Sequence, residues 1–178
     1  MKYLAFLLCT SVIFLNSCTK DRTLQPVNFG NDSVNLKINE YAASASTQPN
    51  EFGVLSDWVE IYNAGNDTFK AAKNKTFITD NISFKGQYAL PAFKIAPKGY
   101  LLIFCDGSDT VANQIHTNFK LSSAGEELDL FALSGTDTVA LDIRSFGLQE
   151  AGKSEGRNPD GSNNWQVFDI PTPGQPNN

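Results

Sequence analysis

The sequence has few of the side chains that most often carry catalysis. Its 178 residues include one histidine, His116, and three cysteines. A single imidazole excludes metal sites built from several histidines, and it leaves one general base for any serine or cysteine nucleophile. The common hydrolase, zinc-protease, phosphate-loop and dinucleotide-binding motifs are also absent. We therefore expect the chain not to be an enzyme.

Positive charge is scarce as well. The chain has fourteen basic and nineteen acidic residues, which gives a net charge of −5. A nucleic-acid-binding protein normally presents a basic surface, so we expect no nucleic-acid partner. The chain is 41% hydrophobic and 11% aromatic. This composition is enough for the core of one ordinary domain and excludes a disordered chain.

One long apolar run is present, and it lies at the N-terminus. Lys2 precedes an apolar stretch over residues 3–14. This stretch is shorter than the ~20 residues of a membrane-spanning helix but has the length of a signal-peptide core. It ends in the sequence Leu15-Asn16-Ser17-Cys18, which resembles the lipobox of bacterial lipoproteins. The resemblance implies that Cys18 is lipidated and becomes the first mature residue; the alternative is a secretory signal with a chance cysteine.

The lipobox divides the chain into three predicted segments. Residues 1–17 form a signal peptide, residues 18–33 the lipidated cysteine and a flexible tether, and residues 34–178 the folded domain. Removing the signal leaves 161 residues with a net charge of −6. Several acyl chains anchor a protein stably, so we expect attachment to the membrane through Cys18. The expected location is a bacterial cell envelope, on the periplasmic or surface face of the outer membrane.

Each of the three cysteines falls in a different predicted segment of the chain. Cys9 leaves with the signal peptide, Cys18 is lipidated, and Cys105 remains alone at the end of an apolar run. We therefore expect no intramolecular disulfide and a buried, structural thiol at Cys105.

From Val34 onward the pattern is typical of a β protein, because short apolar or alternating runs are separated by Gly, Pro, Asn and Asp. Residues 58–63 alternate, and residues 100–105 form a continuous apolar run of the kind found in central strands. Tight reversals are expected at 96–99, 134–137 and 158–161. The spacing predicts an all-β, two-sheet antiparallel sandwich. Its other strands are expected at 34–38, 77–78, 82–84, 88–90, 93–95, 119–121, 128–130, 139–141 and 165–168.

Five segments in order resemble a lamin tail domain. They are Ile38-Asn39-Glu40; Asp57-Trp58-Val59-Glu60-Ile61-Tyr62-Asn63-Ala64-Gly65; Ile95 to Ile103; His116 to Glu126; and Arg157 to Ser162 with Trp165, Pro171 to Gly174 and Asn177. The match covers residues 34–178. The resemblance implies that the sandwich is of the immunoglobulin-like type.

Most of the distinctive polar and aromatic residues suit roles in holding this fold together. Arg157 precedes a tight turn and is expected to pair with a carboxylate such as Glu60 or Glu40. His116 lies in a polar stretch and is expected to be solvated or bonded to backbone. If they are exposed, Trp58, Tyr62 and Trp165 are weak candidates for an aromatic binding patch.

Calcium is the most credible metal, although we expect no cofactor. Asp106-Gly107-Ser108-Asp109 places two carboxylates and a hydroxyl on one loop, and hard oxygen ligands of this kind suit Ca²⁺. The loop lacks the ligand spacing of an EF-hand. Asp106 and Asp109 are therefore weak candidates, and an exposed acidic turn is the favoured interpretation.

Two functions follow. The first is a lipid-anchored binding module of the cell envelope that recognises a protein or a glycan. The alternative is a secreted-type hydrolase, a phosphodiesterase or glycosidase that uses surface carboxylates with a calcium ion. The alternative arises because bacterial lamin tail domains often accompany nucleases and phosphoesterases. The resemblance, however, takes up nearly all of this chain.

Overall fold

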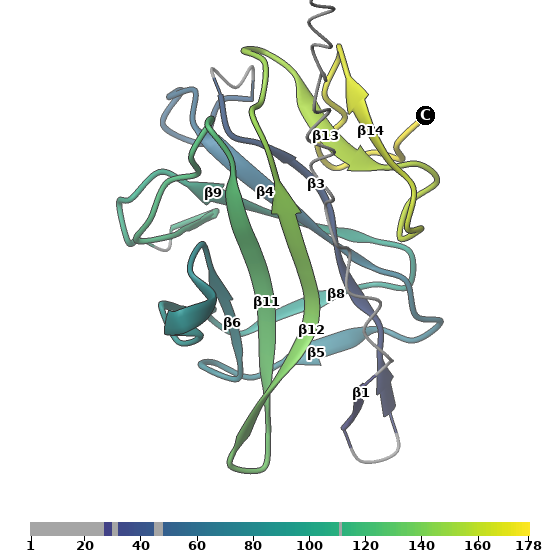
Figure 1. The fold of residues 1–178 in the computed structure, drawn as a ribbon. Coiled ribbons are helices and arrows are strands. Elements are labelled where there is room, and N and C mark those ends of the chain that lie inside the picture. The colour runs from purple at the N-terminus through teal and green to yellow at the C-terminus, as the bar shows by residue number, and fades with distance from the viewer. Residues whose placement is uncertain (1–26, 30–31, 45–47, 111) are drawn as a thin grey trace, which may run out of the picture.

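The computed structural model describes residues 27–29, 32–44, 48–110 and 112–178, and these residues form a β sandwich (Figure 1). One main sheet contains, in order, β10 (Ile115–His116), β9 (Tyr100–Cys105), β4 (Asp57–Asn63), β3 (Leu36–Ala42), β13 (Ser154–Arg157) and β14 (Trp165–Phe168). The other contains β12 (Asp137–Phe146), β11 (Glu126–Ser134), β6 (Thr76–Thr79) and β7 (Tyr88–Ala89). Two smaller pairs join β1 (Val27–Phe29) to β2 (Asp32–Val34) and β5 (Phe69–Ala71) to β8 (Phe93–Ile95).

The core lies between the two main sheets. In Figure 1, β11 and β12 cross in front of β3, β4 and β9. Alternate side chains point into the space between them, and all of the following are fully buried: Ile38, Ile61 and Ile103 from the six-stranded sheet, and Leu128 and Leu130 from the four-stranded sheet. This arrangement confirms the predicted all-β sandwich. The prediction of antiparallel pairing throughout was wrong at one edge, because β9 and β10 are parallel.

The outer face of the six-stranded sheet is also buried over much of its area. Trp58, Ala42 and Phe104 form a second apolar cluster there, with Leu102 packed against it. Coverage on both faces explains why residues 100–105 are continuously apolar, since a half-exposed strand would alternate. Cys105 is fully buried, as predicted.

Turn chemistry was a good guide to chain reversals. The hairpin between β11 and β12 turns at Gly135, which has a φ of 63°, a value that glycine adopts without strain. The reversal before β9 is closed by a hydrogen bond from the Gly99 N–H to the Ala96 carbonyl at 3.0 Å. The reversal predicted at 158–161 joins β13 to β14.

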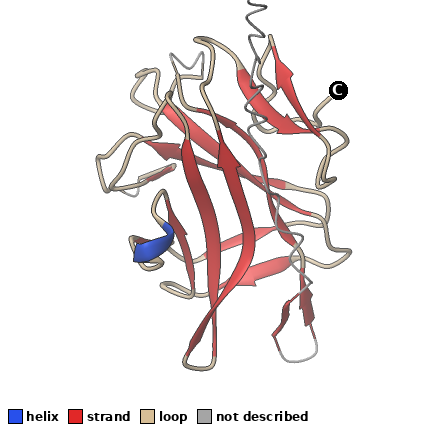
Figure 2. Ribbon diagram, in the orientation of Figure 1, coloured by secondary structure: helices blue, strands red, loops and turns tan. Residues whose placement is uncertain are grey.

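Two predicted strands are absent. Ile82–Phe84 is a short 3-10 helix, η1 (Figure 2), which begins where the Asn81 side chain accepts a hydrogen bond from the Ser83 N–H. This local side-chain to backbone bond competes with strand formation. Residues 119–121 make only one bridge, between Lys120 and Asp106.

The N-terminal predictions fall largely outside the described residues. The signal peptide and Cys18 lie there, as does most of the tether predicted over 18–33. The end of that tether pairs as the β1–β2 hairpin, in which Val27 is opposite Val34. Within the described ranges, no helix has the length and apolar character needed to cross a bilayer.

Candidate functional site

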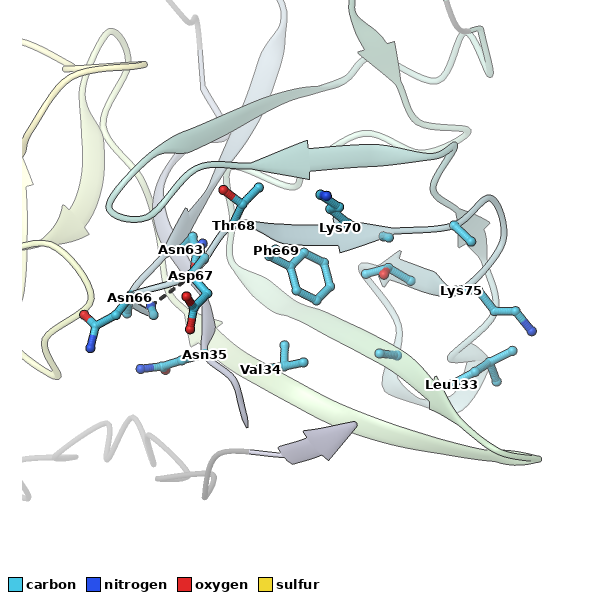
Figure 3. Close-up of a pocket in the computed structure, with 16 residues that line it drawn as sticks. Val34, Asn35, Asn63, Asn66, Asp67, Thr68, Phe69, Lys70, Lys75 and Leu133 are labelled. Atoms are coloured by element: carbon cyan, nitrogen blue, oxygen red, sulfur yellow. Dashed lines mark hydrogen bonds between the residues drawn. The ribbon is translucent and has the colours of Figure 1, made fainter. Parts of the chain in front are cut away.

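An open groove of about 770 Å³ lies beside β5 (Figure 3). We call it the β5 groove. Apolar side chains line its middle, and Figure 3 places Phe69 on one side with Val34 and Leu133 on the other. Its volume is within the range of about 300–1,000 Å³ that is usual for small-ligand sites. The residues that line it are Val34, Asn35, 63–72, Lys75, Thr76, Ala132 and Leu133.

A buried asparagine shapes one end of the groove. Asn63 donates from Nδ2 to the Asp67 carbonyl at 2.8 Å and to the Ile95 carbonyl at 3.1 Å. Its Oδ1 accepts a hydrogen bond from the Gly65 N–H at 3.0 Å. Asn63 is the last residue of β4. Its side chain satisfies backbone groups near the end of that strand and fixes the loop that leads into β5.

The floor of the groove is fixed by packing. Phe69 lies against Phe93 of β8, with ring centroids 5.7 Å apart. Ala71 of β5 and Ala132 of β11 are buried residues with small side chains, so they fill little of the groove that they line. Small residues beside a fixed aromatic ring leave space that a ligand can occupy.

The rim of the groove has polar side chains without hydrogen-bond or ion-pair partners among the described residues. Within the described residues, the side chains of Asn35, Asn66, Asp67, Thr68 and Lys75 make no hydrogen bond or ion pair. Asn66, Asp67, Thr68 and Lys75 are exposed. Their hydrogen-bonding capacity is therefore available to a ligand.

Two carboxylates of the six-stranded sheet, unlike the polar side chains of the groove rim, are buried and hydrogen-bonded within the protein. Glu40 and Glu60 are opposite each other on β3 and β4, and both are fully buried. The C-terminal segment covers them. The Thr172 N–H donates to Glu40 at 2.9 Å, and the Gly174 N–H donates to Glu60 at 2.6 Å. The pair is thus closed to a substrate.

Burial dominates the electrostatics of this pair. Removal from water raises the pKa of Glu60 to about 8, and the nearby Glu40 and Asp160 carboxylates add to the effect. Hydrogen bonds from Asn39 and Gly174 oppose it. Burial also raises the pKa of Glu40, against hydrogen bonds from Ser154 and Thr172.

Arg157 pairs with a different carboxylate from the one expected. Its Nη2 donates to Asp142 Oδ2 at 2.9 Å, and its Nε donates to the Ile38 carbonyl at 2.7 Å. The predicted pairing with a carboxylate is confirmed, but the partner is neither Glu40 nor Glu60, because Asp142 reaches across from β12. Asp142 also accepts the Ile38 N–H at 2.9 Å, so the contact joins the two main sheets.

The imidazole of His116 is neither solvated nor bonded to backbone, contrary to the prediction. It is fully buried between two carboxylates: Nδ1 lies 2.7 Å from Asp106 Oδ2, and Nε2 lies 2.9 Å from Glu51 Oε2. Its ring stacks on Phe104 at 5.6 Å. Burial alone would lower the pKa of His116, but the hydrogen bonds to Asp106 and Glu51 outweigh it and raise the pKa.

The calcium candidates are not brought together as a metal site. One oxygen of Asp106 contacts His116, and the other accepts a hydrogen bond from the Ser108 N–H at 3.0 Å. Asp109 is exposed. In the part of the chain that the structure describes, no group of three or more His, Cys, Asp or Glu residues is arranged to hold a metal.

The three aromatic candidates do not form an exposed patch. Trp58 is fully buried and Tyr62 is 8% exposed, so neither offers a ring face to a partner. Trp165 is partly buried, with the Arg144 guanidinium 4.1 Å and the Arg157 guanidinium 4.5 Å from its ring centre. Its ring is stacked within the protein rather than presented for binding.

The β5 groove itself was missed from the sequence. Its residues come from β2, β5, β6, β11 and the loop after β4, and no local pattern brings these segments together. The nearest signal was the turn Asn63-Ala64-Gly65-Asn66, which indicates a loop but not a cavity. None of the protein-family models, curated proteins or solved structures compared with the chain matches it.

Proposed function

We propose that this chain is a non-catalytic binding module, anchored by lipid in a bacterial cell envelope, that holds a segment of a protein or glycan in the β5 groove. The observation that carries the proposal is the unused polar rim around an apolar floor. Binding sites combine an apolar lining with a few polar groups that fix orientation, and the β5 groove has both.

The anchor and the family belong to the same proposal. The lipobox at Leu15 to Cys18 supports lipidation of Cys18, and the five ordered segments support an immunoglobulin-like sandwich of the lamin tail type. Metabolic labelling with palmitate tests the anchor. Wild-type chain is expected to take up label and Cys18→Ala is not; equal labelling of the two would contradict lipidation.

The hydrolase alternative has less support. A glycosidase needs two carboxyl groups facing a sugar across an open cleft. Glu40 and Glu60 lie beneath the C-terminal segment, and Asp106 is held by His116. Turnover of generic phosphodiester or glycoside substrates, lost on substitution of one carboxylate, would favour the alternative.

Blocking the groove tests the binding function directly. Ala72 is exposed and lines the groove, so Ala72→Trp is expected to fill it without disturbing the core. Lys73→Trp is the matched control, because Lys73 is exposed but does not line the groove. Full-length wild type and both variants are screened in detergent against arrays of envelope glycans and short peptides. Ligands retained by wild type and Lys73→Trp but lost by Ala72→Trp would support the proposal; identical profiles would contradict it.

A further inference from the structure

The edge of a β-strand runs along the β5 groove. Within the described residues β5 pairs only with β8, through Phe69 opposite Ile95 and Ala71 opposite Phe93. In Figure 3 the strand that carries Phe69 borders the cavity, and its partner strand lies on the far side from Val34 and Leu133. The edge of β5 that faces the groove therefore has no strand beside it. A free strand edge recognises an extended peptide through main-chain hydrogen bonds.

Charge is distributed unequally along the groove. Asp67 lies at one end, beside Asn35 and Asn66, Lys70 lies between the two ends, and Lys75 lies at the other end, beside Leu133 (Figure 3). None of these three charged side chains has an ion-pair partner among the described residues. The groove is thus suited to a ligand with a cation at one end and an anion at the other.

We infer that the β5 groove binds a short peptide with free ends, aligned parallel to β5. The peptide's ammonium group meets Asp67, its carboxylate meets Lys75, and its backbone pairs with β5. This inference rests on the proposed binding function and names its ligand. Because β5 has three residues, a pairing peptide extends over about three residues at about 3.3 Å each.

The direction follows from chain order. Asp67 precedes β5 and Lys75 follows it. A parallel peptide therefore places its N-terminus at Asp67 and its C-terminus at Lys75, so both contacts are attractive. An antiparallel peptide would place its carboxylate beside Asp67 and its ammonium beside Lys75, and both contacts would be repulsive.

The apolar floor determines which side chain the groove prefers in the middle of the peptide. Phe69 and Val34 lie on opposite sides of the middle of the groove, and Leu133 lies toward its Lys75 end. A peptide with an apolar central residue and strand-forming neighbours fits this surface. A neutral glycan, by contrast, would gain nothing from the separated charges of Asp67 and Lys75.

The test uses four forms of the tripeptide Val-Leu-Val: both ends free, N-acetylated, C-amidated, and blocked at both ends. Affinity for the full chain in detergent is measured by isothermal titration calorimetry. The free form is expected to bind best, and each single block is expected to weaken binding about twofold to fivefold, because the ion pairs to the exposed Asp67 and Lys75 are screened by solvent. Asp67→Asn is expected to remove the effect of acetylation alone, and Lys75→Gln that of amidation alone. Asp137→Asn and Lys73→Gln, which alter exposed charges outside the groove, serve as controls.

The outcomes separate the two proposals. Binding that is insensitive to blocked ends, or sensitivity that survives both groove substitutions, would overturn the peptide assignment. If a glycan binds wild type but not Ala72→Trp, and no peptide binds, the peptide assignment fails and the proposed binding function of the β5 groove stands. If neither class binds in the groove, both fail.

Discussion

The interior of the six-stranded sheet and the rim of the β5 groove both contain polar side chains, but only those of the interior have hydrogen-bond partners among the described residues. In the interior, Glu60 accepts hydrogen bonds from Asn39 at 3.0 Å and from Gly174 at 2.6 Å. In the groove, Asp67 and Lys75 have no side-chain partner within the described residues. One set of polar groups is satisfied by the protein itself, and the other has no side-chain partner in the part of the chain that the structure describes.

This difference separates stability from recognition. Removing one partner of a buried polar contact leaves the other unsatisfied, and the fold loses free energy. Substituting an exposed side chain without partners has little effect on folding. We therefore expect interior substitutions to change the free energy of unfolding and groove substitutions to change binding.

Asp142→Asn is expected to have the largest effect. It leaves the Arg157 guanidinium, which is 3% exposed, without its carboxylate partner. Breaking a buried ion pair in this way costs about 3–5 kcal/mol in the free energy of unfolding. Urea unfolding followed by circular dichroism measures the loss. Lys37→Gln is the control, since Lys37 is partly exposed and 3.8 Å from Asp142, and a loss below about 1 kcal/mol is expected. Equal losses from the two variants would contradict the account.

His116→Gln is expected to cost about 2 kcal/mol near pH 6, because it breaks charge-assisted hydrogen bonds to Asp106 and Glu51. The pKa of His116 is raised, so its contribution is complete below the unfolded value near 6.5 and is lost as the pH rises through the folded value. The pKa values of Asp106 and Glu51 are lowered, so their contribution is lost as the pH falls through those values.

The difference in stability between wild type and His116→Gln is therefore expected to be greatest at about pH 5–6.5 and to shrink toward pH 9. Unfolding curves collected across this range test the expectation. A difference that stays constant with pH would show that His116 acts by packing alone.

Glu60→Gln is expected to change how stability depends on pH. The pKa of Glu60 rises from 4.5 to about 8 on folding, so the folded state binds the proton more tightly than the unfolded state. Wild-type stability should fall as the pH rises from 4.5 to about 8, and the decrease should be clearly smaller in the variant, which lacks this titrating carboxyl. Glu150→Gln, at an exposed position, is the control and should keep the wild-type slope.

Groove substitutions are expected to have the smallest effect on folding. Asp67→Asn, Lys75→Gln and Ala72→Trp should each change the free energy of unfolding by less than about 0.5 kcal/mol. The same urea titrations provide the measurement. A loss of several kcal/mol from any of them would mean that the groove rim supports the fold, and would weaken the comparison.

Local chemistry explains which parts of the fold were predictable. Residues 57–63 alternate between the two faces of a strand, and Gly135 allows a tight turn, so β4 and the β11–β12 hairpin could be inferred from neighbouring residues. β13 was not predicted, because Ser154 to Arg157 has no apolar pattern. Its strand conformation depends on pairing with β3 and β14.

The contacts that define the sites are long-range and were not predictable from one sequence. Arg157 lies 15 residues from Asp142, and His116 lies 65 residues from Glu51. Nothing in the sequence near either residue distinguishes the true partner from other carboxylates. The β5 groove is of the same kind, because Val34, Phe69 and Leu133 meet only once both sheets have formed.

The most direct test of the central claim is to map where a ligand binds. Free Val-Leu-Val is added to the isotopically labelled full chain in detergent, and backbone amide shifts are followed by NMR. The account predicts shift changes that cluster at residues 66–72 and Lys75 and that disappear in Ala72→Trp but persist in Lys73→Trp. Changes centred instead on Glu40, Glu60 and Gly174 would place recognition on the covered face and contradict the account.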